Sequence, residues 1–143
     1  MIFGYGCGLR AKELTELKVR DIDFDRGFLK VTKGKNGKRR NIPLQANHLR
    51  YLYHYKIEQG LSSKHTFFTV TQTTIGIYFN QLQQRLGLKP PYYSLHHLRH
   101  SIASHLIDRG MDIELVQAFL GHTTLTTTQI YINPAKKITS WNI

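Results

Sequence analysis

The sequence has one cysteine, few acidic residues and no long apolar run. Cys7 is the only cysteine in 143 residues, so an internal disulfide is excluded and an intracellular setting is expected. Its apolar neighbours favour a small core residue over a nucleophile. No hydrophobic stretch reaches the roughly 20 residues that cross a bilayer, and the first residues lack a secretory leader. We therefore expect a single-domain cytoplasmic protein without a membrane partner.

The shortage of acidic residues makes the chain strongly basic. With 20 Lys and Arg against 9 Asp and Glu, the net charge is 20 − 9 = +11. Between Arg26 and Ile107 the only acidic residue is Glu58, whereas acidic residues cluster on both sides of this stretch. The distribution predicts one positive face, which favours nucleic acid as the partner. A uniformly solvated basic surface is the competing interpretation.

The stretch from 93 to 133 carries most of the chemistry. On a helix, His96, Arg99 and His100 lie at i, i+3 and i+4 and share one face. Apolar residues at helical spacing would bury the adjoining face: Leu95, Leu98, Ile102 and Leu106. The pattern predicts a packed helix with an edge of arginine and imidazole groups.

A second helix is expected over 113–120. Gly110 would stop the first helix in a left-handed conformation, and Asp112 can cap the next one. Gly121 would end this helix at a sharp turn before His122, and Tyr131 follows on a threonine-rich segment. We expect four of these side chains to surround one anion: His96, Arg99, His122 and Tyr131.

An arginine near the N-terminus is a further candidate for anion binding. Leu9, Leu14 and Leu17 mark one helix face, and Arg10 lies at the beginning of that helix. There its charge would add to the exposed backbone donors of the first turn. A surface arginine paired with Glu13, or with a nearby aspartate, is the alternative.

Residues 21–44 read as three antiparallel strands, with turns at 25–27 and at the Lys-Asn-Gly sequence. The second hairpin is unusually basic, through Lys30, Lys33, Lys35, Lys38, Arg39 and Arg40. A solvated hairpin and a probe for a DNA groove are both consistent with this composition.

Two amphipathic helices are expected between the strands and the histidine-rich stretch. The first covers 45–59, with four residues facing inward: Leu49, Leu52, Tyr53 and Ile57. The second ends at Gly87, before two prolines, and its apolar face comprises Ile75, Tyr78, Phe79, Leu82 and Leu86.

These motifs together resemble the tyrosine recombinases, the phage integrase family of the lambda integrase, Cre and Xer type. The family pattern of His-x-x-Arg, Leu-Gly-His and a tyrosine about nine residues later occurs here in order. Gly-Leu-Arg-x-x-Glu-Leu around Arg10 resembles the first arginine box of the family. Gly34-Lys35 followed by Arg-x-x-Pro-Leu resembles its lysine hairpin, with Lys33 as a rival to Lys35.

The resemblance implies an α+β fold, mostly α-helical, with a small three-stranded antiparallel sheet in the N-terminal part. Residues 1–143 would be the catalytic domain, beginning partway, with the separate DNA-clamping domain outside the chain. The implied activity is metal-independent cleavage and rejoining of DNA through a 3′-phosphotyrosyl intermediate, as in the integration or recombination of mobile elements. The catalytic residues it implies are Arg10, Lys35, His96, Arg99, His122 and Tyr131.

The implied partners are double-stranded DNA and further copies of the chain, as a synaptic tetramer on DNA, at the nucleoid of a bacterial or phage-infected cell. No cofactor, metal or small-molecule substrate is expected. The additional DNA-binding candidates are Lys33, Lys38, Arg39 and Arg40.

Three other interpretations compete with this one. His96 and His100 could bind zinc, although the glutamate of a His-Glu-x-x-His site and a third ligand are missing from the sequence pattern. Helices 95–109 and 112–120 could form a helix-turn-helix that only binds DNA. A type IB topoisomerase would share the tyrosine chemistry, but the basic hairpin and the Leu-Gly-His motif favour a recombinase.

Overall fold

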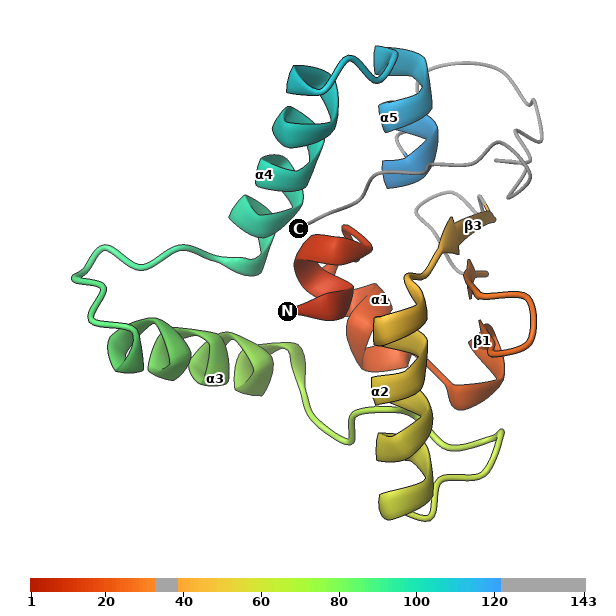
Figure 1. Cartoon of the computed structure of the whole chain (residues 1–143). Coiled ribbons are helices and arrows are strands. Elements are labelled where there is room, and N and C mark those ends of the chain that lie inside the picture. The colour runs from red at the N-terminus through yellow and green to blue at the C-terminus, as the bar shows by residue number, and fades with distance from the viewer. Residues whose placement is uncertain (33–38, 122–143) are drawn as a thin grey trace.

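The computed structural model describes residues 1–32 and 39–121. The sheet and the helices are arranged as the sequence predicts, mostly helical with a small sheet in the N-terminal part (Figure 1). Within the described residues, every helix is too short or too polar to span a bilayer. The elements in chain order are a π-helical segment η1 (Ile2–Gly6), α1 (Ala11–Glu16), a 3-10 turn η2 (Val19–Asp21), β1 (Ile22–Asp23), β2 (Phe28–Val31), β3 (Arg40–Pro43), α2 (Ala46–Glu58), α3 (Gln72–Arg85), α4 (Leu95–Asp108) and α5 (Ile113–Leu120).

The sheet is the antiparallel meander that the sequence predicts, in the order β1-β2-β3. Leu29 lies opposite Ile22 on one side and opposite Ile42 on the other. Leu29 and Ile42 are fully buried because alternate side chains of a strand point to the same face. Gly27 has a φ of 73° in the turn between β1 and β2, a conformation that glycine adopts without strain.

Two apolar clusters hold the helices in place. The main core joins η1, α1, the sheet and α2, and it includes Phe3, Leu14 and Leu52. Ile102, Leu106, Val116 and Leu120 form a second cluster between α4 and α5. Phe119 packs against both clusters. In Figure 1, η1 and α1 consequently lie between the α4–α5 pair and α2.

The inward face of α2 differs in part from the prediction. Leu52 is buried and Leu49 packs against the core, as expected, but Tyr53 and Ile57 are exposed. Tyr55 packs inward instead, with its ring stacked on Phe67. Helical spacing allowed either face, and the aromatic cluster around Phe67 selects the one that carries Tyr55.

The apolar face predicted for α3 is also largely wrong. Ile75 packs against the core, whereas Tyr78, Leu82 and Leu86 are exposed. The reason is the placement of the helix: α3 contacts α1 and then extends away from the core before the chain returns to α4 (Figure 1). The buried side chain of α3 is polar. The amide of Gln83 donates to the carbonyl of Tyr93 at 2.9 Å and accepts from its N–H at 2.8 Å.

Candidate active site

Arg10 is the N-cap residue of α1, directly after a tight turn at Gly8. Gly8 has a φ of +55°, and a Cβ there would come within 2.9 Å of Leu120 Cδ2, so the turn requires glycine. The Arg10 side chain donates from Nη1 to Glu13 Oε1 at 3.1 Å and from Nη2 to the carbonyl oxygen of Gly121 at 3.3 Å. The pairing with Glu13, which was the alternative interpretation, is therefore present, and the same side chain reaches the end of α5; anion binding by Arg10 stays a prediction.

Arg99 lies on the buried side of α4. Its Nη1 donates to the carbonyl oxygen of Gly8 and its Nη2 to that of Leu120. Burial, followed by the neighbouring charges of Arg10 and Arg40, lowers the pKa of Arg99 to about 10, and Glu13 opposes this shift. The guanidinium is therefore still charged near neutral pH, and it joins the N-terminal turn to the carboxyl end of α5.

Arg40 belongs to the same cluster. Its Nη1 and Nη2 donate to Glu13 Oε1 and Oε2, each at 2.9 Å, in a bidentate ion pair. The Arg40 side chain is 7% exposed, whereas that of Arg10 is 27% exposed. The sequence placed Arg40 among the DNA-binding residues of the basic hairpin, but the structure places it inside, beside the candidate catalytic arginines.

Glu13 is the one carboxylate within this group of arginines in the described part of the chain. Burial by itself would raise its pKa, but hydrogen bonds from Arg40 and from the Arg10 backbone N–H, together with the charges of both arginines, hold the pKa below its ordinary value. Glu13 is therefore ionised at neutral pH. It forms ion pairs with Arg10 and Arg40.

His96 lies on the exposed face of α4, and its Nε2 is 2.9 Å from the Nε2 of His100. Desolvation, then the charge of His100 and those of Arg99, His97 and Arg10, lower the pKa of His96. A neutral imidazole can accept a proton. His97 points elsewhere, because its Nδ1 accepts from the N–H of Ser94 and caps the helix.

The remaining candidates are divided between exposed and undescribed positions. Arg39 is exposed, just before β3. Five candidates lie outside the described residues: Lys33, Lys35, Lys38, His122 and Tyr131.

The predicted helix ends are mostly confirmed. Gly121, the last described residue, ends α5 with a φ of 67°, which is the left-handed turn predicted for it. Gly110 is likewise left-handed, with a φ of 82°, but Asp112 makes no side-chain capping bond at its N-cap position.

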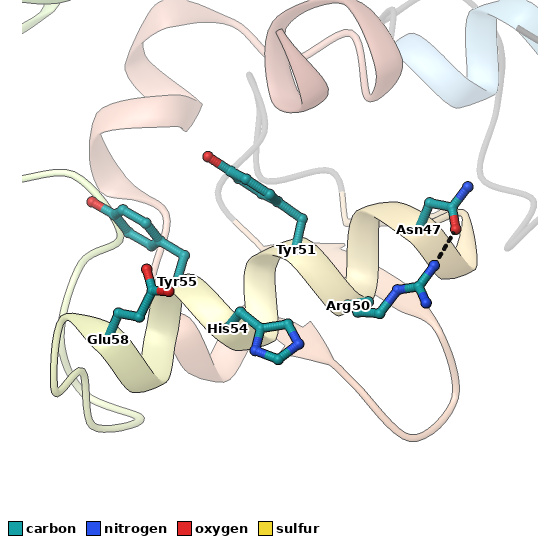
Figure 2. A pocket seen from close by; sticks show the side chains of 6 residues that line it. All are labelled: Asn47, Arg50, Tyr51, His54, Tyr55 and Glu58. Carbon is teal, nitrogen blue, oxygen red and sulfur yellow. Dashed lines mark hydrogen bonds between the residues drawn. The ribbon is translucent and has the colours of Figure 1, made fainter.

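A hollow along α2 is separate from the arginine cluster. Its cavity volume is about 340 Å³. Figure 2 shows Tyr51 and Tyr55 pointing to the same side of the helix, with His54 turned away and Arg50 bonded to the Asn47 amide oxygen at 2.7 Å. The lining residues are Asn47, Arg50, Tyr51, His54, Tyr55 and Glu58, and none of them is a candidate catalytic residue.

The arrangement suits the binding of an anion near the carboxyl end of α5. A guanidinium has five N–H donors, and the bonds to residues within 1–32 and 39–121 use two on Arg10 and two on Arg99, which leaves three on each within this part of the chain. Planar donors of this kind match the oxygens of a phosphate. No group of three or more His, Cys, Asp or Glu side chains within residues 1–32 and 39–121 is placed to hold a metal ion.

The contribution of Arg40 was missed in the sequence, although a signal for it exists. Arg40 and Ile42 are two residues apart in β3, so they point to the same face, and Ile42 is buried. Strand alternation thus predicts an inward Arg40 and an outward Asn41. The length of the charge run obscured that pattern.

The model of the phage integrase family matches residues 1–137, and the chain belongs to that family.

Among its relatives, tyrosine recombinase XerA of Pyrococcus furiosus is 37% identical over 141 residues, which cover 93% of this chain and 48% of the relative. Tyrosine recombinase XerC of Proteus mirabilis is 36% identical, covering 89% of this chain and 44% of the relative. The chain thus spans about half the length of the curated relatives it matches.

The fold is also similar to those of solved recombinase structures. A crystal structure of XerA recombinase superposes with a TM-score of 0.74 and 25% identity, covering 86% of this chain and 46% of the other. The XerH site-specific recombinase bound to its difH substrate, in a pre-cleavage complex, has a TM-score of 0.71 and 30% identity, covering 86% of this chain and 38% of the other.

Proposed function

We propose that this chain is the catalytic part of a site-specific DNA recombinase that cleaves and rejoins strands through a 3′-phosphotyrosyl intermediate. The observation that carries the proposal is the meeting of Arg10 and Arg99 at the carboxyl end of α5, where the chain passes to His122. Relatives named tyrosine recombinase support it, as do structures of XerH with difH DNA before and after cleavage.

In the proposed reaction, the Tyr131 oxygen attacks a backbone phosphorus and the 5′ oxygen leaves as a hydroxyl. The phosphodiester energy is kept in the phosphotyrosyl bond, so the reverse attack by a DNA hydroxyl rejoins a strand without ATP. Arg10 and Arg99 would bind the nonbridging oxygens, on which negative charge develops. Hydrogen bonds fix both guanidinium groups, that of Arg99 buried and that of Arg10 partly exposed, so they need little reorganisation.

Three further residues would handle protons and hydrogen bonds. The phenol of Tyr131 has an ordinary pKa of about 10, so a base accelerates its attack. His96, whose pKa is lowered, would accept or orient that proton. His122 would donate a hydrogen bond to the phosphate, and Lys35 would protonate the departing 5′ oxygen, with Lys33 as its rival.

We also propose that residues 1–143 form the catalytic domain and that double-stranded DNA is the substrate. Lys33, Lys38 and Arg39 would contact the backbone through the basic hairpin. Strand exchange needs several active sites, so the chain would self-associate on DNA as a synaptic tetramer. The expected cellular place is the nucleoid of a bacterial or phage-infected cell, where mobile elements recombine.

A covalent-trapping assay tests the chemistry. Wild type and Tyr131→Phe are incubated with nicked duplexes and supercoiled plasmid, quenched in detergent and analysed for protein-linked DNA. We expect an adduct that maps to Tyr131 by mass spectrometry in wild type and is lost in the variant, while DNA affinity changes little. An adduct that persists in Tyr131→Phe would assign the nucleophile to another residue.

The same assay separates the neighbouring interpretations. A 5′-thio leaving group needs no acid, so it should rescue Lys35→Ala, whereas rescue of Lys33→Ala alone would assign the acid to Lys33. DNA binding without any adduct, even with a DNA-clamping domain supplied, would favour a helix-turn-helix module. Plasmid relaxation without strand exchange would favour a type IB topoisomerase.

A further inference from the structure

Arg40 has no direct role in the proposed chemistry. Its side chain is almost fully buried, and both of its Nη atoms are bonded to Glu13. Arg10, by contrast, is partly exposed, and near the carboxyl end of α5 it has donors that no described residue uses. A phosphate bound by Arg10 and Arg99 would therefore not contact Arg40 directly, and Arg40 could affect it only through Glu13 and Arg10.

Stability alone accounts poorly for this buried pair. Removing a guanidinium and a carboxylate from water carries a desolvation cost that their mutual attraction only partly offsets. The Nε of Arg40 is also buried without a hydrogen-bond partner among the described residues, which adds to that cost. The ion pair is better explained by what it positions.

The contacts of Glu13 show that the ion pair with Arg40 positions Arg10. Its Oε1 accepts from Arg40 Nη1 at 2.9 Å and from Arg10 Nη1 at 3.1 Å. Its Oε2 accepts from Arg40 Nη2 and from the Arg10 backbone N–H, each at 2.9 Å. Arg40 thus fixes the carboxylate against which both the backbone and the side chain of Arg10 are placed.

The charges lead to the same conclusion. Glu13 and Arg40 neutralise each other as a bidentate pair, which leaves the positive charge of Arg10 for an external anion. If Arg40 were absent, the carboxylate would be free to turn and pair with Arg10 alone. Arg10 would then be neutralised by its own neighbour.

Arg40 also packs against the end of α5. A Cβ on Gly121 would lie 2.9 Å from Arg40 Nη1 and 3.4 Å from its Cδ, so the guanidinium is pressed against this turn. The carbonyl of the same glycine accepts from Arg10 Nη2. One side chain of β3 therefore contacts both the acid that holds Arg10 and the turn from which the chain continues to His122.

We propose that Arg40 is a positioning residue for the reaction: it holds and neutralises Glu13, so that Arg10 keeps its orientation and its charge for a DNA phosphate. This role rests on the proposed strand-transfer function. It also separates Arg40 from the DNA-contacting residues of the basic hairpin.

The test compares Arg40→Gln with Arg26→Gln, which removes the same charge from an exposed turn of the same sheet. Single-turnover cleavage is measured on a duplex with an ordinary scissile phosphate and on one with a methylphosphonate, which lacks the nonbridging charge. We expect Arg40→Gln to slow cleavage of the phosphate on the order of 10²-fold with unchanged DNA affinity. The loss should shrink on the methylphosphonate, while Arg26→Gln has little effect on either.

A double variant distinguishes the proposed effect on Arg10 from a loss of activity that is caused by unfolding. If Arg40 acts by neutralising Glu13, then Glu13→Gln added to Arg40→Gln should recover part of the lost rate, since no carboxylate remains to capture Arg10. An equal deficit on both substrates, or a double variant slower than the single one, would overturn the proposal and leave Arg40 with a structural role.

A readout without DNA separates this proposal from the proposed function. In NMR spectra, Arg40→Gln should raise the pKa of Glu13 and shift the guanidinium signals of Arg10, whereas Arg26→Gln should change neither. If wild type forms no adduct but these shifts occur, the proposed function fails and the coupling of the three residues stands. If the Arg10 signals do not move, the positioning role fails whatever the cleavage assay gives.

Discussion

At the scale of single residues, Glu13 connects the stability of the fold to the acidity of the solution. Its folded-state pKa is depressed mainly because Arg40 and Arg10 outweigh the effect of burial. A carboxylate of this kind contributes fully to stability above its unfolded-state pKa of about 4.5. That contribution is lost as the pH falls through the lower, folded-state value.

We therefore predict that Glu13→Gln lowers the free energy of unfolding by about 3 kcal/mol or more at pH 7, since it leaves the buried charge of Arg40 unpaired. The difference from wild type should narrow as the pH falls from about 4.5 through the lower, folded-state pKa of Glu13. Urea denaturation at a series of pH values measures this. The exposed Glu16→Gln serves as control and should stay within about 0.5 kcal/mol of wild type. A difference that is constant with pH would contradict the ion-pair explanation.

The sequence predicts single residues well where a local pattern decides their place. The left-handed glycines 110 and 121 and the buried Cys7 follow from helix endings and composition. The sequence predicts fewer of the contacts between elements that are far apart along the chain. The pairing of Arg40 with Glu13 joins residues 27 positions apart, and no local rule selects Glu13 as the partner of Arg40 among the acidic residues of the chain.

At the scale of elements, the sequence predicts which segments are helices and strands better than which faces are buried. The helices α2, α3, α4 and α5 and the three strands lie where periodicity and turns place them. The outward Tyr78 and Leu82 of α3 show the limit, since an amphipathic pattern does not reveal that a helix packs at one end only.

The link between α3 and α4 supplies a prediction at this scale. Gln83 is buried, and its amide makes two hydrogen bonds to the backbone of Tyr93. Gln83→Ala should lower the free energy of unfolding by about 1–3 kcal/mol, because the Tyr93 backbone groups lose their partner. It should also speed hydrogen exchange at the Tyr93 amide. The exposed neighbour Gln84→Ala is the matched control, and equal effects of the two variants would show that the bonds do not hold the link.

At the scale of the whole molecule, the net charge of +11 governs how DNA would be bound. Basic residues that neutralise phosphates release counterions, so affinity falls as a power of the salt concentration. Tyr131→Phe lacks the proposed nucleophile, so DNA binding should be measurable in this variant without cleavage. We expect log K to fall linearly with log salt concentration, by a slope of about −0.9 per phosphate contact, in fluorescence anisotropy with duplex DNA. A flat dependence would contradict a positive DNA-binding face.

Family membership followed from motifs that are local in sequence but far apart from one another. The Arg10 box, the hairpin and the His-x-x-Arg helix are each short, and their order along the chain made the resemblance specific. The assembly of Arg10, Arg40 and Arg99 at the end of α5 depends on packing between β3, α4, α5 and the N-terminal turn, which the sequence does not display.

The two hydrogen bonds from Arg99 to backbone carbonyls have a consequence for how the chain folds during synthesis. Its partners are the carbonyls of Gly8 and Leu120, which lie 91 and 21 residues away along the chain. Synthesis proceeds from the N-terminus, and contacts between distant positions form only after both have been made. Gly8 therefore leaves the ribosome long before either Arg99 or the end of α5 exists. The arginines proposed to bind a phosphate can therefore come together only after residue 120 has been synthesised, and a shorter nascent chain lacks the proposed anion site.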